Sequence, residues 1–360
     1  VLNCAECGVH SAGAMMDQVR RPSAWQVHGA LIAAQVMFGG GSVVGKFGVH
    51  AFNPLLFALI REAVAGPVLL SLALCVDGGM LPARKDAALF LGMGFCIFTN
   101  QAFFIIGDKL AGPVISSAWQ CSQPIFTLII SLALGWEMAS QAKTLGIVVS
   151  FLGGAFMVCY GQPLQSNGFQ GNLMLLLNCL GTSCFVILGK VALRKYPSLS
   201  TTAWSYMSAT VMMVITASGL NSQCWFIQFV CPAGDVSAFQ CGGHPTSCTA
   251  WHVPEGALLP LLYWILLNSM AAYFLITWAN QYARAGYVLA YTALQPFTST
   301  VLTVIIIESG NSTLRMPGWN ALGGIGVIAG MLLILWDGKK QHDQDTSTNE
   351  VCLIPGERAA

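Results

Sequence analysis

Long apolar runs separated by short polar connections dominate this sequence. A helix needs about 20 consecutive, mainly apolar residues to cross a bilayer. Ten runs come close to that length: 26–45, 54–76, 87–106, 113–134, 144–160, 172–189, 201–220, 257–279, 286–307 and 318–336. The fifth and sixth runs are short and the second contains Arg61 and Glu62, so nine spans is the alternative. The pattern predicts an all-α integral membrane protein with ten transmembrane helices.

The run 112–137 carries its polar residues on one side. Ser116, Gln120 and Gln123 follow one another at i, i+4 and i+7, which places them on one helical face. Pro124 comes directly after this stripe, where it removes a backbone donor and allows the helix to bend. A polar stripe beside a bend is expected to face the interior of a helix bundle.

The run 286–308 repeats that design. Tyr287, Tyr291 and Gln295 lie at i, i+4 and i+8, and Pro296 follows them. A membrane helix that occurs twice, each time with a polar stripe and a proline, is the leading functional clue in the chain.

The two halves of the chain share further landmarks in the same order. The pairs are Gly45-Lys46 with Gly189-Lys190, Pro54 with Pro197, Pro124 with Pro296, and Gly146 and Gly153 with Gly323 and Gly330. They predict two repeats, 26–160 and 172–336, between a segment at 1–25 and a disordered tail at 337–360. Five spans per repeat is an odd number, so the second repeat would be inverted, as is typical of secondary transporters.

Charge supports this topology. Only 9% of the residues are charged, against about 25% in soluble domains. With a cytosolic N-terminus, eleven Lys and Arg residues fall on the cytosolic side and three on the other, so both termini are predicted cytosolic. The cytosolic set is Arg20, Arg21, Arg84, Lys85, Lys143, Lys190, Arg194, Lys195, Arg284, Lys339 and Lys340. The net charge of +1 gives no reason to expect a nucleic acid partner.

A cysteine-rich loop at 221–256 interrupts the symmetry. It lies on the predicted non-cytosolic side, where its four cysteines could form two disulfides in any of three connectivities. These cysteines are Cys224, Cys231, Cys241 and Cys248. Zinc binding with His244 and His252 is the alternative, although the spacing matches no standard zinc finger. We expect no cofactor.

Two segments carry a family resemblance. They are NPLLFALIREA at 53–63 and LLNCLGTSCFVILGKVALRKYPSLSTTAW at 176–204. With the two proline-bearing spans, they resemble the EamA family of the drug/metabolite transporter superfamily, and in particular its plant nodulin-like, walls-are-thin-type branch. The resemblance implies ten transmembrane helices and export or exchange of small organic solutes. The cysteine-rich loop is not part of that pattern.

Several polar residues inside the spans are candidates for solute binding, because buried polar groups in a membrane are costly and usually face a cavity. They are Gln120, Gln123, Tyr287, Tyr291, Gln295, Asn100 and Asn178. The alternative is that these side chains only bond neighbouring helices together. Arg61 is either an attractor for an anionic solute or half of a structural ion pair.

Acidic residues offer candidates for proton coupling. Glu62 is the only acid well inside a predicted span and therefore the leading candidate. Glu137 and Glu308 each close a proline-bearing run and are second candidates, with anchoring at the membrane interface as their alternative role. A facilitator without a coupling ion is also compatible with the sequence.

Glycine pairs could bring helices close together. Gly41 with Gly45 and Gly326 with Gly330 have the required spacing, which suits a homodimer interface or contacts within one chain. Three functions remain open at this point. The sequence favours a multi-pass carrier of small organic solutes; a membrane receptor or scaffold that uses the loop is the alternative, and a membrane-embedded enzyme is the weakest.

Overall fold

The structure is a computed structural model of the chain. It describes residues 22–45, 52–78, 81–111, 116, 119–136, 140–160, 168–231, 240–241, 244–246, 248, 250–308, 319–334 and 336–337. Most of the 1–25 segment, Glu137 and the tail after 337 therefore lie outside the described residues.

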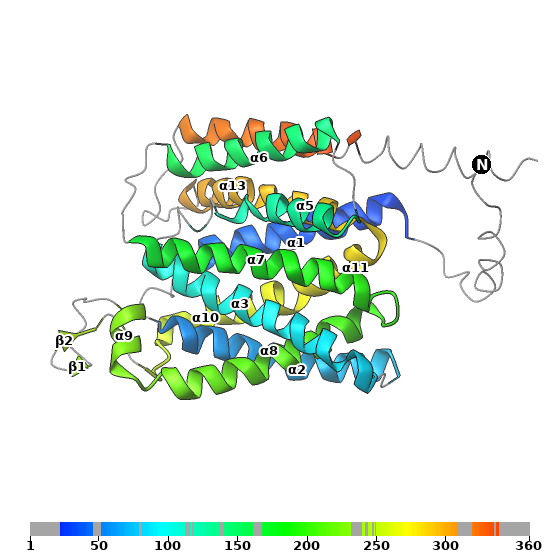
Figure 1. Ribbon diagram of the computed structural model, residues 1–360. Helices are drawn as coiled ribbons and strands as arrows, with labels where there is room; N and C mark the ends of the chain where they lie inside the picture. Colours follow the sequence, from blue (N-terminus) through cyan, green and yellow to red (C-terminus); the bar gives the residue numbers. More distant parts are fainter. Residues whose placement is uncertain are drawn as a thin grey trace, which may run out of the picture.

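The described chain is a bundle of helices that lie side by side (Figure 1). The first half contains α1 (Ala24–Gly45), α2 (Pro54–Val76), η2 (Arg84–Asp86), α3 (Ala87–Ala111), α5 (Gln123–Ala133) and α6 (Gln141–Cys159). The second half contains α7 (Gly168–Ala192), α8 (Ser198–Leu220), α9 (Cys224–Val230), η3 (Glu255–Ala257), α10 (Leu258–Tyr263), η4 (Trp264–Ala272), α11 (Tyr273–Tyr282), α12 (Ala285–Ala290), η5 (Tyr291–Ala293), α13 (Leu294–Glu308), η6 (Trp319–Leu322) and a last helix, Gly323–Ile334. The only strands described are β1 (Gln240–Cys241) and β2 (His244–Pro245), which form a short antiparallel pair.

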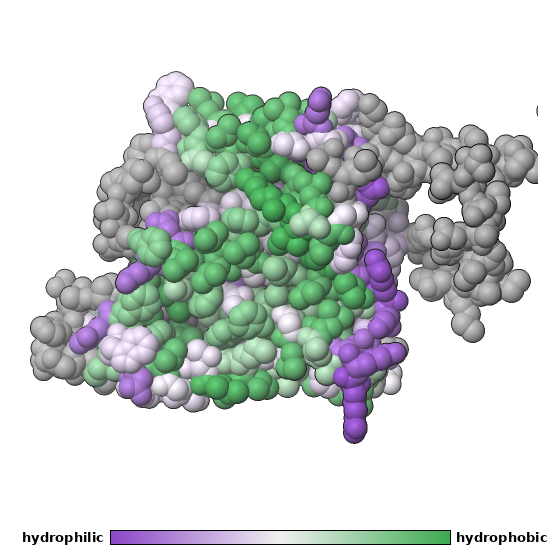
Figure 2. Space-filling model, viewed as in Figure 1, coloured by the Kyte–Doolittle hydropathy of each residue, from purple (hydrophilic) through white to green (hydrophobic). Residues whose placement is uncertain are grey.

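The all-helical prediction is confirmed, and helix covers described residues in each of the ten apolar runs. By length and composition, five helical segments of the described chain could cross a membrane. They are Pro54–Val76, Arg84–Leu110, Phe169–Ala192, Glu255–Tyr282 and Ala285–Glu308. Figure 2 shows a broad apolar surface along the bundle and a hydrophilic edge at its right-hand end, where α7 connects to α8. The arrangement of ten spans as inverted repeats stays a prediction.

Helices α2 and α8 run antiparallel and are tied together at both ends. Each has 23 residues, and each is followed by a capping residue that reaches the start of the other helix. Asp77 Oδ2 accepts hydrogen bonds from Ser200 N at 3.0 Å and Ser200 Oγ at 2.5 Å. At the opposite end, Asn221 Oδ1 accepts one from Asn53 Nδ2 at 2.6 Å. We call these two contacts the α2–α8 clasp.

Helix α6 and the last helix cross at glycines along one edge of the bundle (top of Figure 1). A Cβ atom on Gly146 would lie 2.7 Å from the Gly330 carbonyl oxygen, and one on Gly153 would lie 2.7 Å from the Gly323 carbonyl oxygen. These four glycines therefore allow backbone contact that a side chain would prevent. Gly330 packs within the chain, so a homodimer at this pair stays only a prediction.

The loop after α8 covers one end of the bundle, on the left of Figure 1. The buried side chains of Phe226, Ile227 and Val230 on α9 pack against α2, α3 and α8. A disulfide joins Cys231 to Cys248, and Cys224 is also disulfide-bonded. Asn221 from the clasp donates a hydrogen bond to the Ala250 carbonyl oxygen. We call this the capped end.

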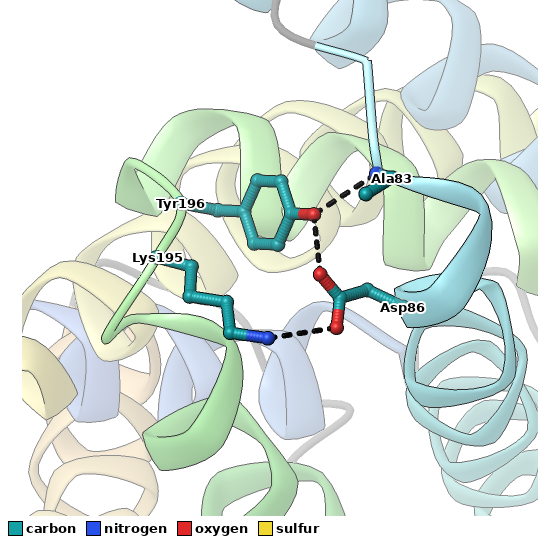
Figure 3. Close-up of polar contacts among 4 residues, drawn as sticks. All are labelled: Ala83, Asp86, Lys195 and Tyr196. Atoms are coloured by element: carbon teal, nitrogen blue, oxygen red, sulfur yellow. Dashed lines mark hydrogen bonds and ion pairs between the residues drawn. The ribbon is translucent and has the colours of Figure 1, made fainter.

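The other end holds a small polar contact between the two halves of the chain (Figure 3). Asp86, in η2 before α3, accepts hydrogen bonds from Lys195 Nζ at 2.9 Å and from Tyr196 OH at 2.8 Å. The Tyr196 hydroxyl accepts one from Ala83 N at 3.0 Å. Donation to Asp86 raises the pKa of Lys195 above its ordinary value, so the ion pair is present at neutral pH. We call this the open end.

Candidate functional site

A small cavity lies inside the bundle, between helices of both halves. Its volume is about 60 Å³, which is room for a few water molecules. Six of the eight predicted binding residues line it: Arg61, Asn100, Gln120, Gln123, Asn178 and Gln295. The other lining residues are Gln35, Phe38, Gln101, Phe104, Thr182, Phe185, Val186, Trp264, Tyr273, Ile276, Leu289 and Thr292. We call it the central cavity.

A chain of amide groups crosses one wall of the central cavity. Gln123 Nε2 donates to Gln120 Oε1, and Gln120 Nε2 donates to Asn178 Oδ1 at 2.9 Å. Asn178 Nδ2 then donates to the Asn100 carbonyl oxygen at 2.8 Å, and the Tyr273 hydroxyl donates to Asn100 Oδ1. The chain links α5, α7, α3 and α11, so residues far apart in sequence hold one another in position.

The second half supplies the opposite wall, with a spacing that the polar stripe did not predict. Leu289, Thr292 and Gln295 line the cavity at i, i+3 and i+6. Thr292 and Gln295 follow Gln120 and Gln123 by 172 residues, the same offset that separates Pro124 from Pro296. The Thr292 hydroxyl donates to the Gln120 carbonyl oxygen at 3.4 Å. The duplicated pair is therefore Gln120 and Gln123 with Thr292 and Gln295.

The two candidate tyrosines lie away from the lining of the central cavity. The Tyr291 hydroxyl is 2.5 Å from His28 Nδ1, and the Tyr287 ring lies 5.3 Å from Lys143 Nζ. The physical reason is the single 3-10 turn η5, which spans Tyr291–Ala293. Each of its residues turns the chain by about 120° instead of about 100°, which shifts the spacing; Tyr291 and Gln295 both contact α1, but only Gln295 lines the cavity.

Arg61 projects from α2 toward the central cavity and is almost fully buried. Its Nε donates to Ser269 Oγ at 3.2 Å, and its guanidinium lies 4.4 Å from the Trp264 ring centre. Asn53 fixes the start of this helix, because its side chain accepts hydrogen bonds from Leu55 N and Leu56 N. Within the described residues Arg61 makes no ion pair, so its charge is held by an aromatic face and a hydroxyl.

Several polar atoms around the central cavity lack a hydrogen-bond partner in the described chain. Gln35 Nε2 and Trp264 Nε1 are unused donors, and Gln101 Oε1 is an unused acceptor. Buried polar atoms without partners are costly, which suits atoms that bind a ligand in another state. The polar stripes in the sequence did not reveal Gln35, Trp264 and Tyr273 as residues of the cavity wall. Of these three residues, the sequence could have revealed only Gln35, a buried amide in the apolar middle of α1.

The acidic candidates lie apart from the central cavity. Glu62 is fully buried on the side of α2 that faces α8, and neither of its carboxylate oxygens has a hydrogen-bond partner in the described chain. It does not line the cavity, although its neighbour Arg61 does. Glu308 ends α13 with an exposed side chain, and Glu137 lies outside the described residues.

Comparisons with known proteins agree with this architecture. Residues 27–159 match the EamA-like transporter family. Two proteins of Arabidopsis thaliana are similar over most of the chain: WAT1-related protein At5g13670 is 22% identical, and WAT1-related protein At3g53210 is 24% identical. Each alignment covers 90% of this chain. It covers 87% of At5g13670 and 88% of At3g53210.

A solved crystal structure has the same fold. It aligns with a TM-score of 0.62 and 15% sequence identity, over 85% of this chain and 95% of the other. At this level of identity the likeness concerns the fold alone. The family match and the full-length plant relatives confirm the resemblance predicted from the sequence, and with it a multi-pass membrane protein that acts in transport. Residues 27–159 thus match the EamA-like transporter family, and the chain as a whole is similar to plant WAT1-related proteins.

Proposed function

We propose that the chain carries a small organic metabolite across the membrane by alternating access between two inverted repeats, 26–160 and 172–336. The observation that supports this most is that polar side chains from both halves meet in one buried cavity. Two relations are those expected of inverted repeats: the α2–α8 clasp, and the shared offset of 172 residues from Gln120 and Gln123 to Thr292 and Gln295.

The size of the central cavity agrees with a carrier that changes shape. Sites for small molecules usually measure about 300–1,000 Å³, whereas this cavity measures about 60 Å³. A metabolite therefore needs the surrounding helices to separate before it binds. Opening would also give the solute access to the unused groups of Gln35, Gln101 and Trp264.

Arg61 makes an anionic solute the favoured class. A buried guanidinium without an acidic partner in the described chain is positioned to bind a carboxylate or phosphate group from the cavity. The amide walls would then bind neutral polar groups, while Phe38, Phe104 and Phe185 surround an apolar part. Arg61 forms no close ion pair among the described residues, and Glu62 attracts its charge only from a longer distance.

The receptor alternative is not favoured. A loop that recruits a partner would present its apolar surface outward, whereas α9 buries three apolar side chains against the bundle. This described part of the loop therefore packs as part of the bundle, although Trp225 and Trp251 stay exposed.

Paired substitution of the amides tests the carrier. We expect Gln123→Ala with Gln295→Ala to lower flux at least tenfold, because each change removes a buried hydrogen-bonding group worth about 1–3 kcal/mol. The measurement is counterflow in proteoliposomes with a panel of radiolabelled carboxylates and amino acids. Gln141→Ala with Gln170→Ala is the matched control, since both amides are exposed and lie outside the cavity. Wild-type flux by the folded cavity variant would contradict the proposal.

Glu62 is the proposed coupling residue if a proton gradient drives transport. Glu62→Gln keeps the shape of the side chain and removes the exchangeable proton. We expect this variant to lose uptake driven by a pH gradient and to keep solute exchange at equal pH. Equal gradient-driven uptake by the variant and the wild type would exclude Glu62 as the proton carrier.

A further inference from the structure

A second and larger cavity opens at the open end of the bundle. Its volume is about 440 Å³, within the range of sites that bind small molecules. Helices α5, α7, α11 and α12 and the residues next to their ends supply its lining: Ser131, Trp136, Lys190, Leu193, Arg194, Asn280, Gln281, Arg284 and Ala285. We call it the vestibule.

Positive charge dominates the vestibule. Lys190, Arg194 and Arg284 contribute three cationic groups, and none of the nine lining residues is acidic. Lys190 Nζ donates to the carbonyl oxygens of Asn280 and Ala283, at the C-terminal end of α11, which fixes its ammonium group at the wall. The Arg194 side chain is exposed to water and can turn toward a ligand. Such a surface attracts anions and repels cations.

The vestibule lies in line with the central cavity. On three helices, one residue that lines the vestibule and one that lines the central cavity are four positions apart in the sequence. Four positions correspond to about 6 Å along a helix. The pairs are Val186 with Lys190 on α7, Ile276 with Asn280 on α11, and Ala285 with Leu289 on α12. One turn of these helices separates the two spaces. Asn280 Nδ2 donates to the Val186 carbonyl oxygen at 2.7 Å and holds that layer closed.

We infer that the vestibule is a binding site for the carboxylate or phosphate group of a small organic anion, one turn before the central cavity. This rests on the proposed carrier function and names the class of its solute. The guanidinium group of Arg194 can form two parallel hydrogen bonds with such a group, and Lys190 and Arg284 add positive charge to the same cavity. Arg61 then supplies the next cation on the path, inside the central cavity. The preference for positive residues at one side of a membrane explains exposed cations such as Arg84, but it does not explain a cavity that three cations enclose.

Trp136 provides a direct measurement, because it lines the vestibule and is 44% exposed. The full-length protein is placed in nanodiscs of phosphatidylcholine and titrated with succinate or inorganic phosphate. The fluorescence difference between the wild type and Trp136→Phe isolates the signal of this tryptophan. We expect the Trp136 fluorescence to change in a saturable way with either anion. Arg194→Gln and Arg284→Gln should each weaken the apparent affinity by about tenfold. Arg84→Gln, at an exposed arginine of the same end, should bind like the wild type.

Three results would overturn the inference. One is equal weakening by Arg84→Gln, which would mean that general surface charge attracts the anion. Another is a change that needs phosphatidylglycerol in the disc, which would assign the vestibule to a lipid headgroup. The third is unchanged binding by Arg194→Gln, whose exposed side chain makes the variant safe to fold. Anion binding is measured without transport, so failure of the carrier proposal would leave a positive binding result intact. Absence of anion binding in a protein that still transports would contradict only the anion site in the vestibule.

Discussion

The two ends of the bundle close the central cavity in different ways. Toward the capped end, Phe57 and Phe52 continue outward from Trp264 in edge-to-face contacts, with ring centres 5.8 Å and 5.4 Å apart. Lys109 Nζ donates to the Phe52 carbonyl oxygen at 2.9 Å, and the disulfide-bonded loop covers this region. Toward the open end, a single helical turn separates the central cavity from the vestibule.

This difference indicates where the path opens with least rearrangement. Opening the capped end would separate several buried aromatic rings and displace a cross-linked loop. Opening the open end requires movement of one layer around Val186, Ile276 and Leu289. If the proposed carrier function holds, we expect the path to open toward the vestibule. By the distribution of Lys and Arg, we predict the vestibule to face the cytosol.

The largest effect should come from the disulfide at the capped end. Cys231→Ser should lower the free energy of unfolding by about 3 kcal/mol, because the bond closes a segment with a sequence separation of 17. Thermal unfolding in nanodiscs, with and without a reductant, measures this. Cys75→Ser is the control, since Cys75 is a free, exposed cysteine. Equal melting of Cys231→Ser and the wild type would show that the cap does not secure this end.

An intermediate effect should follow from the buried half of the clasp. Asn221→Ala leaves Asn53 Nδ2 and the Ala250 carbonyl oxygen without their partner, at a cost of about 2 kcal/mol. Chemical unfolding of the purified protein gives the difference in free energy. Ser222→Ala, at the neighbouring position, loses only an exposed hydrogen bond from Trp251 Nε1 and should change stability little. If Asn221→Ala is as stable as the wild type, the capped end is not held more strongly than the open end.

The smallest effect is expected at the open end. Lys195→Ala removes the ion pair with Asp86, but the Lys195 side chain is 51% exposed and water replaces the contact. Its melting temperature should match that of Lys85→Ala, a neighbouring exposed lysine. Destabilisation as large as that of Asn221→Ala would show that both ends are locked equally, and would contradict the comparison.

Much of the site could be predicted because polar residues are rare in these spans. Gln120, Gln123 and Gln295 stand out against apolar neighbours, so their position on the cavity followed from burial cost alone. Tyr291 was expected on the same stripe but does not line the cavity, because regular helical spacing cannot anticipate the 3-10 turn at that residue. The offset of 172 residues from Gln120 pointed to Thr292 instead.

The aromatic residues of the cavity could not be recognised from the sequence. Trp264 and Tyr273 resemble core residues in sequence, and only the tertiary arrangement brings them beside Arg61 and Asn100. Both border η4, a nine-residue π-helix that starts at Trp264 and ends before Tyr273. Wider helical turns of this kind are frequent at functional sites and carry no simple sequence pattern.

The α2–α8 clasp also has a consequence for biosynthesis. Asn53 and Asp77 belong to the first half of the chain, and their partners Asn221 and Ser200 are translated more than 120 residues later. Until α8 enters the membrane, these polar side chains and Arg61, which waits for Ser269, have no native partners. The first half of the chain is therefore incomplete during synthesis, because its buried polar groups find their partners only when the second half arrives.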